Sequence, residues 1–267
     1  MAKVLDGKKE ADKILARLKK LCAGRRPVTL ATIIVGNRPD SRLYIKLKTA
    51  AARRVGIRTK AFSLPATATQ GQLESLIQKL NRQRAVHGIL LQLPLPSHLH
   101  ADHAVATISP KKDVDGFRLN SLVPSPTIFA VLRLLEIAKP QPNSAITILG
   151  RDSVFTEQLA EQLARQKHRV FIVAPRHDWS SHTKQADVII TVLGRGPRLE
   201  AKDTKSSAIV IDVGIRRVKG KTVGDVALSV WKKAKAVSPV PGGIGPLTVA
   251  GVLWNTYQLV TRHLSSR

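Results

Sequence analysis

The sequence contains little cysteine, few aromatic residues and no long apolar run. Its single cysteine, Cys22, cannot form an internal disulfide bond, which agrees with a reducing compartment. No stretch approaches the roughly 20 consecutive apolar residues that a membrane-spanning helix needs, and residues 1–9 lack the apolar core of a signal peptide. We therefore expect a cytoplasmic protein with no membrane partner.

Acidic residues are also scarce. The chain has 44 lysines and arginines against 18 aspartates and glutamates, which gives a formal net charge of +26. A field of that sign attracts nucleic acid, nucleotide phosphates and polyglutamylated substrates. The basic residues form only short clusters, and an aromatic content of 4% leaves few rings to stack on bases. We favour a solvated basic surface over a dedicated nucleic-acid site.

The order of apolar patterns predicts an α/β fold with two lobes. Helical spacing over residues 11–21 is followed by a continuous β-rich run at 28–35, a helix from about residue 40, a helix over 73–80 and a buried run at 86–93. Strands that alternate with helices indicate a mainly parallel sheet.

The pattern restarts after about residue 120. A helix over residues 129–137, a strand over 145–149 and a helix after Thr156 precede three short apolar runs, at 170–173, 188–192 and 209–213. This rhythm predicts a Rossmann-like lobe. A last helix is expected over residues 247–263.

Tyr44 and Lys48 are four residues apart, so on a helix they share a face, with Ser41 one turn earlier. In a partly buried cleft, desolvation lowers the pKa of a lysine towards the range where its amine acts as a base, and a neighbouring tyrosine hydroxyl completes a proton-transfer pair. The alternative is an ordinary helix with an exposed lysine, and spacing alone favours that alternative.

Gln92 interrupts an apolar strand close to its carboxyl end, where open α/β sheets bind ligands. Such an amide is either held by backbone groups or directed at a substrate or catalytic residue, and both interpretations stay open. Asp115 precedes Gly116, and a turn cap is the commoner use of that pair. The loop over residues 238–248 is either a structural turn or a binding loop.

Together these segments resemble the methylenetetrahydrofolate dehydrogenase/cyclohydrolase family over nearly the whole chain. Several motifs in one order argue against a chance similarity. They are Ser41-x-x-Tyr44-x-x-x-Lys48, Gly88-Ile-Leu-Leu-Gln92-Leu-Pro-Leu-Pro96, Lys112-Asp-Val-Asp115-Gly-Phe, Ile211-Asp-Val-Gly-Ile215, Val223-Gly-Asp225-Val and Pro239-Val-Pro-Gly-Gly-Ile-Gly-Pro-Leu-Thr248.

The resemblance implies two reactions in one folate cleft between the lobes. Methylenetetrahydrofolate is oxidised with NADP, or with NAD in some members, and the methenyl product is hydrolysed to 10-formyltetrahydrofolate. The family pattern makes Lys48 the central catalytic residue, held by Gln92, while Tyr44 orients the folate ring and Asp115 binds the pterin edge. It also implies a set of substrate-binding residues, which are Ser41, Pro241, Gly242, Gly243 and Thr248.

The nucleotide lobe departs from the family pattern after its first strand. Thr156 stands at a glycine position and Gln158 at a proline position, and a side chain at the glycine position is expected to obstruct a pyrophosphate. Asp152 adds a carboxylate, whereas Arg151 and Arg176 can bind a 2′-phosphate and favour NADP. The predicted cofactor-binding residues are Gly150, Arg151, Asp152, Arg176 and Ile215.

We therefore predict a bifunctional folate enzyme with a catalytic domain over residues 1–120, completed by a helix over 246–267, and a Rossmann-like NADP-binding domain over residues 121–245. A homodimer is expected from the resemblance, and no metal is expected, because the histidines after Pro96 match no family site. Two alternatives stay open. One is a cyclohydrolase with weakened or lost dehydrogenase activity, and the other is a basic nucleic-acid-binding protein on an enzyme scaffold.

Overall fold

The structure is a computed structural model that describes residues 1–24, 26–118, 120–176 and 179–265, with side chains up to residue 261. The chain forms two compact units. The six-stranded unit contains Met1–Glu10 and Thr127–Leu247, and the three-stranded unit contains Ala11–Pro126 and the chain from Thr248 onward. Among the residues described, no helix is long and apolar enough to cross a membrane.

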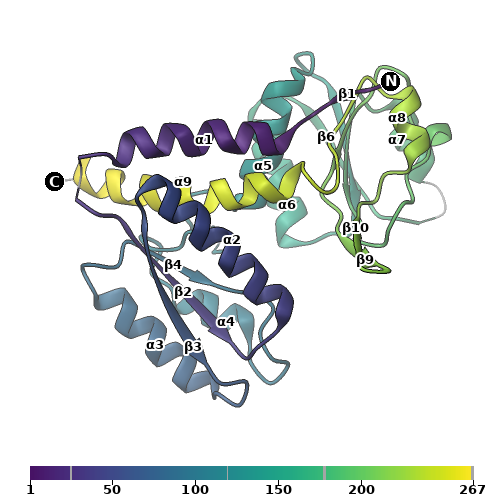
Figure 1. Cartoon of the computed structure of the whole chain (residues 1–267). Coiled ribbons are helices and arrows are strands. Elements are labelled where there is room, and N and C mark those ends of the chain that lie inside the picture. The colour runs from purple at the N-terminus through teal and green to yellow at the C-terminus, as the bar shows by residue number, and fades with distance from the viewer. Residues whose placement is uncertain (25, 119, 177–178, 266–267) are drawn as a thin grey trace. The chain divides into compact units, whose positions relative to one another are not determined.

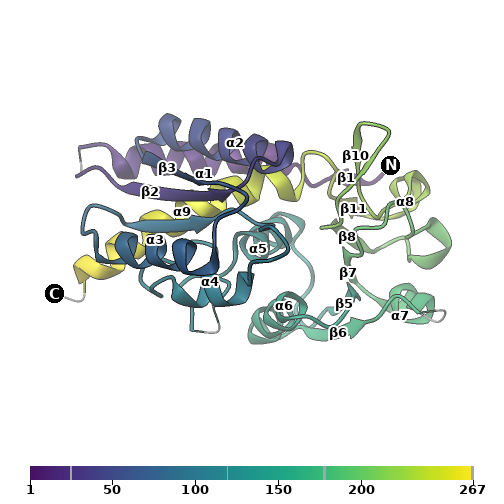
Figure 2. The same ribbon diagram turned by 90° about the horizontal axis from the view of Figure 1, so that it is seen from below.

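The three-stranded unit is built around one buried strand. Its parallel sheet has the order β3 (Arg58–Leu64), β2 (Thr29–Val35) and β4 (Gly88–Leu91). All residues of β2 are buried, as its β-branched run predicts. Helix α2 lies on one face of the sheet, and α3 and α4 lie on the other (Figure 2). The helices of this part are the greater part of α1 (Gly7–Cys22), α2 (Pro39–Val55), α3 (Gln70–Arg82), α4 (Ala101–Thr107) and the greater part of α9 (Ile244–Ser265).

The core of this unit follows the period of β2. Alternate residues Ala31, Ile33 and Val35 pack with apolar residues of α3, among them Leu73 and Ile77. Helix α3 begins at a capping box in which Thr69 and Gln72 each bond the other's backbone N–H.

The six-stranded unit is an all-parallel sheet in the order β1-β11-β8-β7-β5-β6 (Figure 1). Helices α7 and α8 cover one face, and α5 and α6 cover the other (Figure 2). The bounds are β1 Lys3–Val4, β5 Ala145–Gly150, β6 Arg169–Val173, β7 Val188–Val192, β8 Ile209–Asp212, β11 Ala236–Val237, α5 Pro126–Ala138, α6 Val154–Arg165, α7 Trp179–Gln185 and α8 Leu228–Lys233. A short helix, η1 (Ala201–Asp203), and a hairpin of β9 (Arg216–Val218) and β10 (Lys221–Val223) complete it.

The α/β fold in two units matches the prediction, but the first residues group differently from the expected boundary. We expected residues 1–120 to form one lobe, whereas Met1–Glu10 belong to the six-stranded unit because β1 pairs with β11. The last predicted helix extends further at its start and begins at Ile244. The end of the expected range, residues 266–267, lies outside the described residues.

Candidate active site

Helix α2 carries the candidate catalytic lysine on its inner side. Pro39 occupies the first helical turn, where its missing N–H costs nothing, and Gly56 ends the helix with a φ of 81°. The buried residues of the helix include Ser41, Ala52 and Val55. Lys48 is four residues before Ala52 and seven before Val55, so it lies on the same stripe and is itself half-buried.

Lys48 meets Gln92, which directly follows β4. The Lys48 Nζ donates to Gln92 Oε1 at 3.2 Å, and Gln92 Nε2 donates to the Leu93 carbonyl at 2.7 Å. The Gln92 backbone N–H continues the sheet by donating to the Ile33 carbonyl at 2.9 Å. Burial lowers the pKa of Lys48, and the nearby Asp115 opposes that shift. The alternative interpretation, an ordinary helix with Lys48 exposed, is therefore wrong, because Lys48 is half-buried and bound to Gln92.

Asp115 completes this group from a loop beside β4. Burial raises the pKa of Asp115 to about 6, against the attraction of Lys48, which lowers it. The turn itself is held by a different carboxylate, because Asp113 Oδ1 accepts from the Gly116 N–H at 3.0 Å. Gly116 has a φ of 62°, and a Cβ there would lie 2.6 Å from the Val123 carbonyl oxygen. Asp113, rather than Asp115, therefore serves as the turn cap.

Tyr44 and Ser41 lie on the same helix as Lys48 but differ in exposure. Tyr44, one turn before Lys48, is 38% exposed, whereas Ser41 is buried. Thr248 begins the part of α9 that belongs to the three-stranded unit and is half-buried.

Asn255 is a residue that the sequence analysis missed. It is fully buried on α9, and its Nδ2 donates to the carbonyls of Val114, at 2.9 Å, and Pro124, at 2.8 Å. These bonds fix both ends of the loop that carries Asp115. The available signal was an amide at residue 255, between the apolar residues Leu253 and Tyr257 of an otherwise mostly apolar helix, because a buried amide must find partners.

Lys112 departs from the solvated basic surface that the composition predicts, because its amine is bound inside the protein. Its Nζ donates to three carbonyls at the end of α3, those of Leu80 at 2.9 Å, Asn81 at 2.8 Å and Gln83 at 2.8 Å. Burial lowers the pKa of Lys112. A cation at this end of a helix bonds carbonyls that have no partner within the helix.

The six-stranded unit offers a dinucleotide site at the carboxyl edge of its sheet. The chain runs from β5 to β6 on one side and then crosses to β7 on the other, so the switch point lies between β5 and β7. Gly150 ends β5 there, and a Cβ would lie 3.1 Å from Val192 Cβ. Arg151 and Asp152 are exposed beside the start of α6. These features suit a nicotinamide dinucleotide, because Gly150 permits close approach, the start of α6 offers backbone N–H groups, and Arg151 is an exposed cation.

Thr156 does not obstruct that edge in the expected way. Thr156 is 1% exposed. Its Cγ2 would lie 3.6 Å from a Cβ built on Gly150, so the side chain packs inward against the end of β5. The hydroxyl of Thr156 accepts from the Ser153 N–H at 3.0 Å, while Ser153 Oγ accepts from the Thr156 N–H at 3.2 Å. The unusual residue therefore closes a capping box at the start of α6. Gln158, at the expected proline position, is half-buried.

The remaining predicted residues also fall on the six-stranded unit. Arg176, after β6, and Ile215, after β8, are exposed at the carboxyl edge. Gly242 accepts through its carbonyl from the Lys8 N–H at 2.9 Å, and Gly243 donates to the Pro239 carbonyl at 2.7 Å. Pro241 is exposed in the same loop. The structure thus groups Lys48, Gln92 and Asp115 in one unit and the glycine-rich loop and nucleotide residues in the other.

A half-buried lysine held by an amide, together with a Rossmann-type unit, indicates a nucleotide-dependent enzyme with a separate catalytic domain. Two family models match the chain: tetrahydrofolate dehydrogenase/cyclohydrolase, catalytic domain, over residues 5–115, and the NAD(P)-binding domain of the same family over residues 125–264. The chain belongs to the tetrahydrofolate dehydrogenase/cyclohydrolase family.

Named relatives match nearly the whole chain. The bifunctional protein FolD of Sulfurihydrogenibium sp. is 37% identical, with 98% of each chain covered. The crystal structure of FolD from Campylobacter jejuni superimposes with a TM-score of 0.93 at 35% identity, over 98% of this chain and 100% of that one. The Trypanosoma brucei enzyme, solved with NADP and an inhibitor, gives a TM-score of 0.89 at 34% identity, over 98% of both chains.

Proposed function

We propose that this chain oxidises 5,10-methylenetetrahydrofolate to the methenyl compound with NADP and hydrolyses that product to 10-formyltetrahydrofolate. The observation that carries the proposal is the group formed by Lys48, Gln92 and Asp115, in a chain whose two halves match the catalytic and NAD(P)-binding domains of one family.

The hydrolysis needs a group that can accept and return a proton. Water adds to the methenyl carbon and loses one proton, which leaves a hydroxyl on that carbon. The hydroxyl then loses its remaining proton to become the formyl carbonyl while the bond from the carbon to N5 breaks and N5 takes up a proton, so that one proton is released overall. Lys48, whose pKa is lowered by burial, is suited to move these protons because its amine is more readily neutral than that of an exposed lysine. Gln92 orients the amine, and Asp115 provides a carboxylate for the polar edge of the pterin.

The proposal assigns further substrate contacts beside this group. Tyr44 is an exposed ring one turn from Lys48 and is suited to lie against the folate ring. We assign substrate contacts to Ser41, Pro241, Gly242, Gly243 and Thr248 by the family pattern. The excess of cations suits a substrate with a polyglutamate tail, and a homodimer is proposed by likeness to the family.

NADP, when bound, supplies the hydride acceptor for the oxidation. Gly150 and the start of α6 would receive its pyrophosphate, with Ile215 beside the same sheet edge. Arg151 and Arg176 would bind a 2′-phosphate as forked donors, and NAD is the alternative cofactor.

A cyclohydrolase with weakened dehydrogenase activity is the second candidate. The observation that favours it is Asp152, an exposed carboxylate beside Gly150 that would repel a phosphate. The other reason for this candidate was that the side chain of Thr156 would obstruct the pyrophosphate. Thr156 packs inward, which argues against such an obstruction.

The deciding experiment is a paired assay on the wild type, Lys48→Met and a control, Lys46→Met, whose lysine is exposed on the same helix. Formation of NADPH from methylenetetrahydrofolate and decay of the methenyl compound are followed separately. We expect both activities in the wild type and in Lys46→Met, and loss of hydrolysis in Lys48→Met. Hydrolysis without formation of NADPH in the wild type would support the second candidate. A wild type that shows neither activity would overturn both candidates.

A further inference from the structure

Two buried carboxylates organise the sheet edge next to the proposed dinucleotide site. Asp225 is fully buried and accepts from three consecutive backbone N–H groups in the loop after β7. Its Oδ2 accepts from Leu193 at 2.7 Å and Gly194 at 3.0 Å, and its Oδ1 accepts from Arg195 at 3.1 Å. Gly194 has a φ of 62°, which turns successive N–H groups towards one anion. One carboxylate therefore sets the conformation of this loop.

Asp212, the last residue of β8, is bound just as fully. Its Oδ1 accepts from the Thr191 hydroxyl at 3.0 Å, the Gly214 N–H at 3.1 Å and the Asp225 N–H at 3.0 Å. Its Oδ2 accepts from the Val226 N–H at 3.0 Å. Burial raises the pKa of Asp212 to about 6, while backbone hydrogen bonds lower it. Asp212 thereby ties the loop after β8 to the segment that carries Asp225.

The two carboxylates are matched by two glycines. A Cβ on Gly214 would lie 1.8 Å from Asp225 Oδ2, and a Cβ on Gly224 would lie 2.0 Å from Asp212 Oδ2. Each aspartate thus fills the space beside a glycine in the other aspartate's loop. Because neither glycine can accept a side chain without moving a carboxylate, the two loops form one interlocked structure.

The interlocked loops lie at the functional edge of the sheet. The loop after β8 begins at the carboxyl end of a parallel strand, and the segment with Asp225 bonds the loop after the neighbouring strand β7, at the switch point. The β8 loop continues directly to Ile215, an apolar residue that is 45% exposed. Most ligand sites combine such exposed apolar groups with a few placed polar ones. The aspartates themselves are buried, so they act through the loops they hold.

We propose that Asp212 and Asp225 are positioning residues that preorganise the loops after β7 and β8 to receive the nicotinamide dinucleotide, an inference that rests on the proposed function. A loop fixed before binding loses little conformational freedom when the ligand arrives, which favours affinity. The pair thus contributes to cofactor binding without touching the cofactor.

The test is the binding of NADP to Asp225→Asn, measured by titration calorimetry, with amide hydrogen exchange of residues 193–195 in the cofactor-free protein. Asparagine keeps the shape but turns an NH2 group towards N–H donors. We expect faster exchange at these amides and NADP binding weakened by about ten- to a hundredfold. Thr191→Val, which removes one donor to Asp212, is the milder second variant, with an expected loss of about three- to tenfold.

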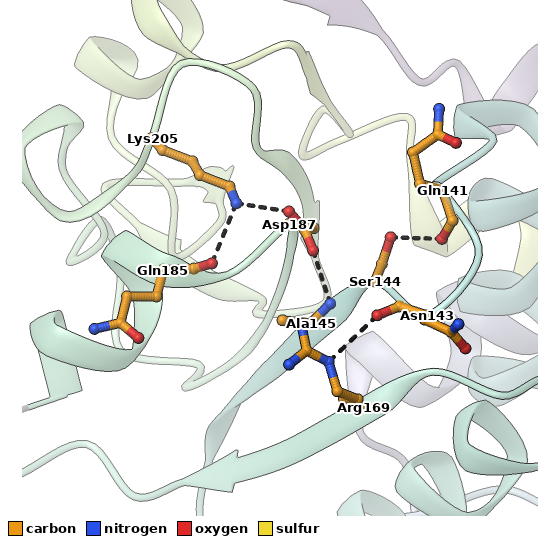
Figure 3. A network of polar contacts seen from close by, with 8 residues as sticks. All are labelled: Gln141, Asn143, Ser144, Ala145, Arg169, Gln185, Asp187 and Lys205. Atoms are coloured by element: carbon orange, nitrogen blue, oxygen red, sulfur yellow. Dashed lines mark hydrogen bonds and ion pairs between the residues drawn. The ribbon is translucent and has the colours of Figure 1, made fainter.

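The control is Asp187→Asn, at the opposite edge of the same sheet. Asp187 accepts from the Ala145 N–H at 2.8 Å and from Lys205 Nζ at 2.6 Å, as Figure 3 shows. We expect this variant to bind NADP within about twofold of the wild type, because its carboxylate holds the amino ends of β5 and β7. Thermal unfolding of all variants verifies that they are folded.

Three outcomes would overturn the inference. Faster exchange with unchanged NADP affinity in Asp225→Asn and Thr191→Val would show that loop order does not matter for binding. Equal loss in Asp187→Asn would assign the effect to general destabilisation. A wild type that binds neither NADP nor NAD would overturn the proposed function first, and the inference with it.

Discussion

Gln92 faces Lys48 with its amide oxygen because its amide nitrogen is already engaged. The nitrogen donates to the Leu93 carbonyl at 2.7 Å, and the oxygen accepts from Lys48 Nζ at 3.2 Å. A reversed amide would place two N–H donors against the lysine and two oxygens against each other. The carbonyl of the next residue therefore determines which atom the lysine meets.

Replacing Gln92 by leucine tests that relationship. Leucine keeps the approximate size but leaves the half-buried lysine without its acceptor, so we expect hydrolysis of the methenyl compound to slow by about ten- to a hundredfold. Gln70→Leu is the matched control, because Gln70 donates to Glu74 and the His100 carbonyl at a different place. Equal rates for Gln92→Leu and the wild type would remove Gln92 from the proposed mechanism.

The raised pKa of Asp115 predicts how stability depends on pH. Between an unfolded pKa near 3.8 and a folded pKa of about 6, the folded chain holds a proton that the unfolded chain releases. The contribution of Asp115 to stability is therefore complete below pH 4 and is lost as pH rises through about 6. Asp115→Asn should gain about 1–3 kcal/mol in unfolding free energy at pH 7 relative to the wild type.

Denaturant unfolding of both proteins from pH 4 to pH 7 measures this difference. We expect the gain of Asp115→Asn to shrink as pH falls from about 6 to about 4. A difference that does not vary with pH would show that the carboxyl does not titrate in this range.

Asn255 should matter for both stability and substrate binding. Asn255→Ala leaves the buried carbonyls of Val114 and Pro124 without their donor, so we expect a loss of about 2–4 kcal/mol in unfolding free energy. We also expect a higher KM for the folate substrate, because the loop that carries Asp115 is released. Gln258→Ala, half-buried on the same helix, is the control. An unchanged KM at a temperature where the variant is folded would contradict the second expectation.

The inward position of Thr156 leads to a prediction opposite to the one that the motif suggested. Thr156→Gly removes the capping box of α6, so we expect a loss of about 1–2 kcal/mol in unfolding free energy. NADP should bind no more than about twofold more tightly, because no obstructing side chain is removed. A tenfold lower Kd for NADP, measured by titration calorimetry, would support the hypothesis that the Thr156 side chain obstructs the pyrophosphate.

Apolar runs identified the central strands and the edge strands β4 and β6, whereas the edge strands β1 and β3 escaped. The runs at residues 28–35 and 188–192 became β2 and β7, because strands buried on both faces are apolar throughout. Strand β3 was missed because its residues are exposed or half-buried at the sheet edge. Strand β1, with two residues, has no periodicity to detect, and its place depends on pairing with residues more than 230 positions away.

The candidate site shows the same division. Helical spacing brought Tyr44, Lys48 and Ser41 to one side of α2, because that information is local. The contacts of Asp225 and Asn255 join residues up to 141 positions apart, which no spacing rule reports. The direction of Thr156 also depended on the packing of Gly150 against Val192.

The pairing of β1 with β11 has a consequence for how the chain is made. Lys3 pairs with Ala236 and Val4 pairs with Val237, so β1 cannot join the sheet of the six-stranded unit until β11 has been synthesised. The three-stranded unit likewise requires α9, which follows later still. During synthesis, both units are therefore completed only by segments made near the end, after most of their apolar strands have already emerged from the ribosome.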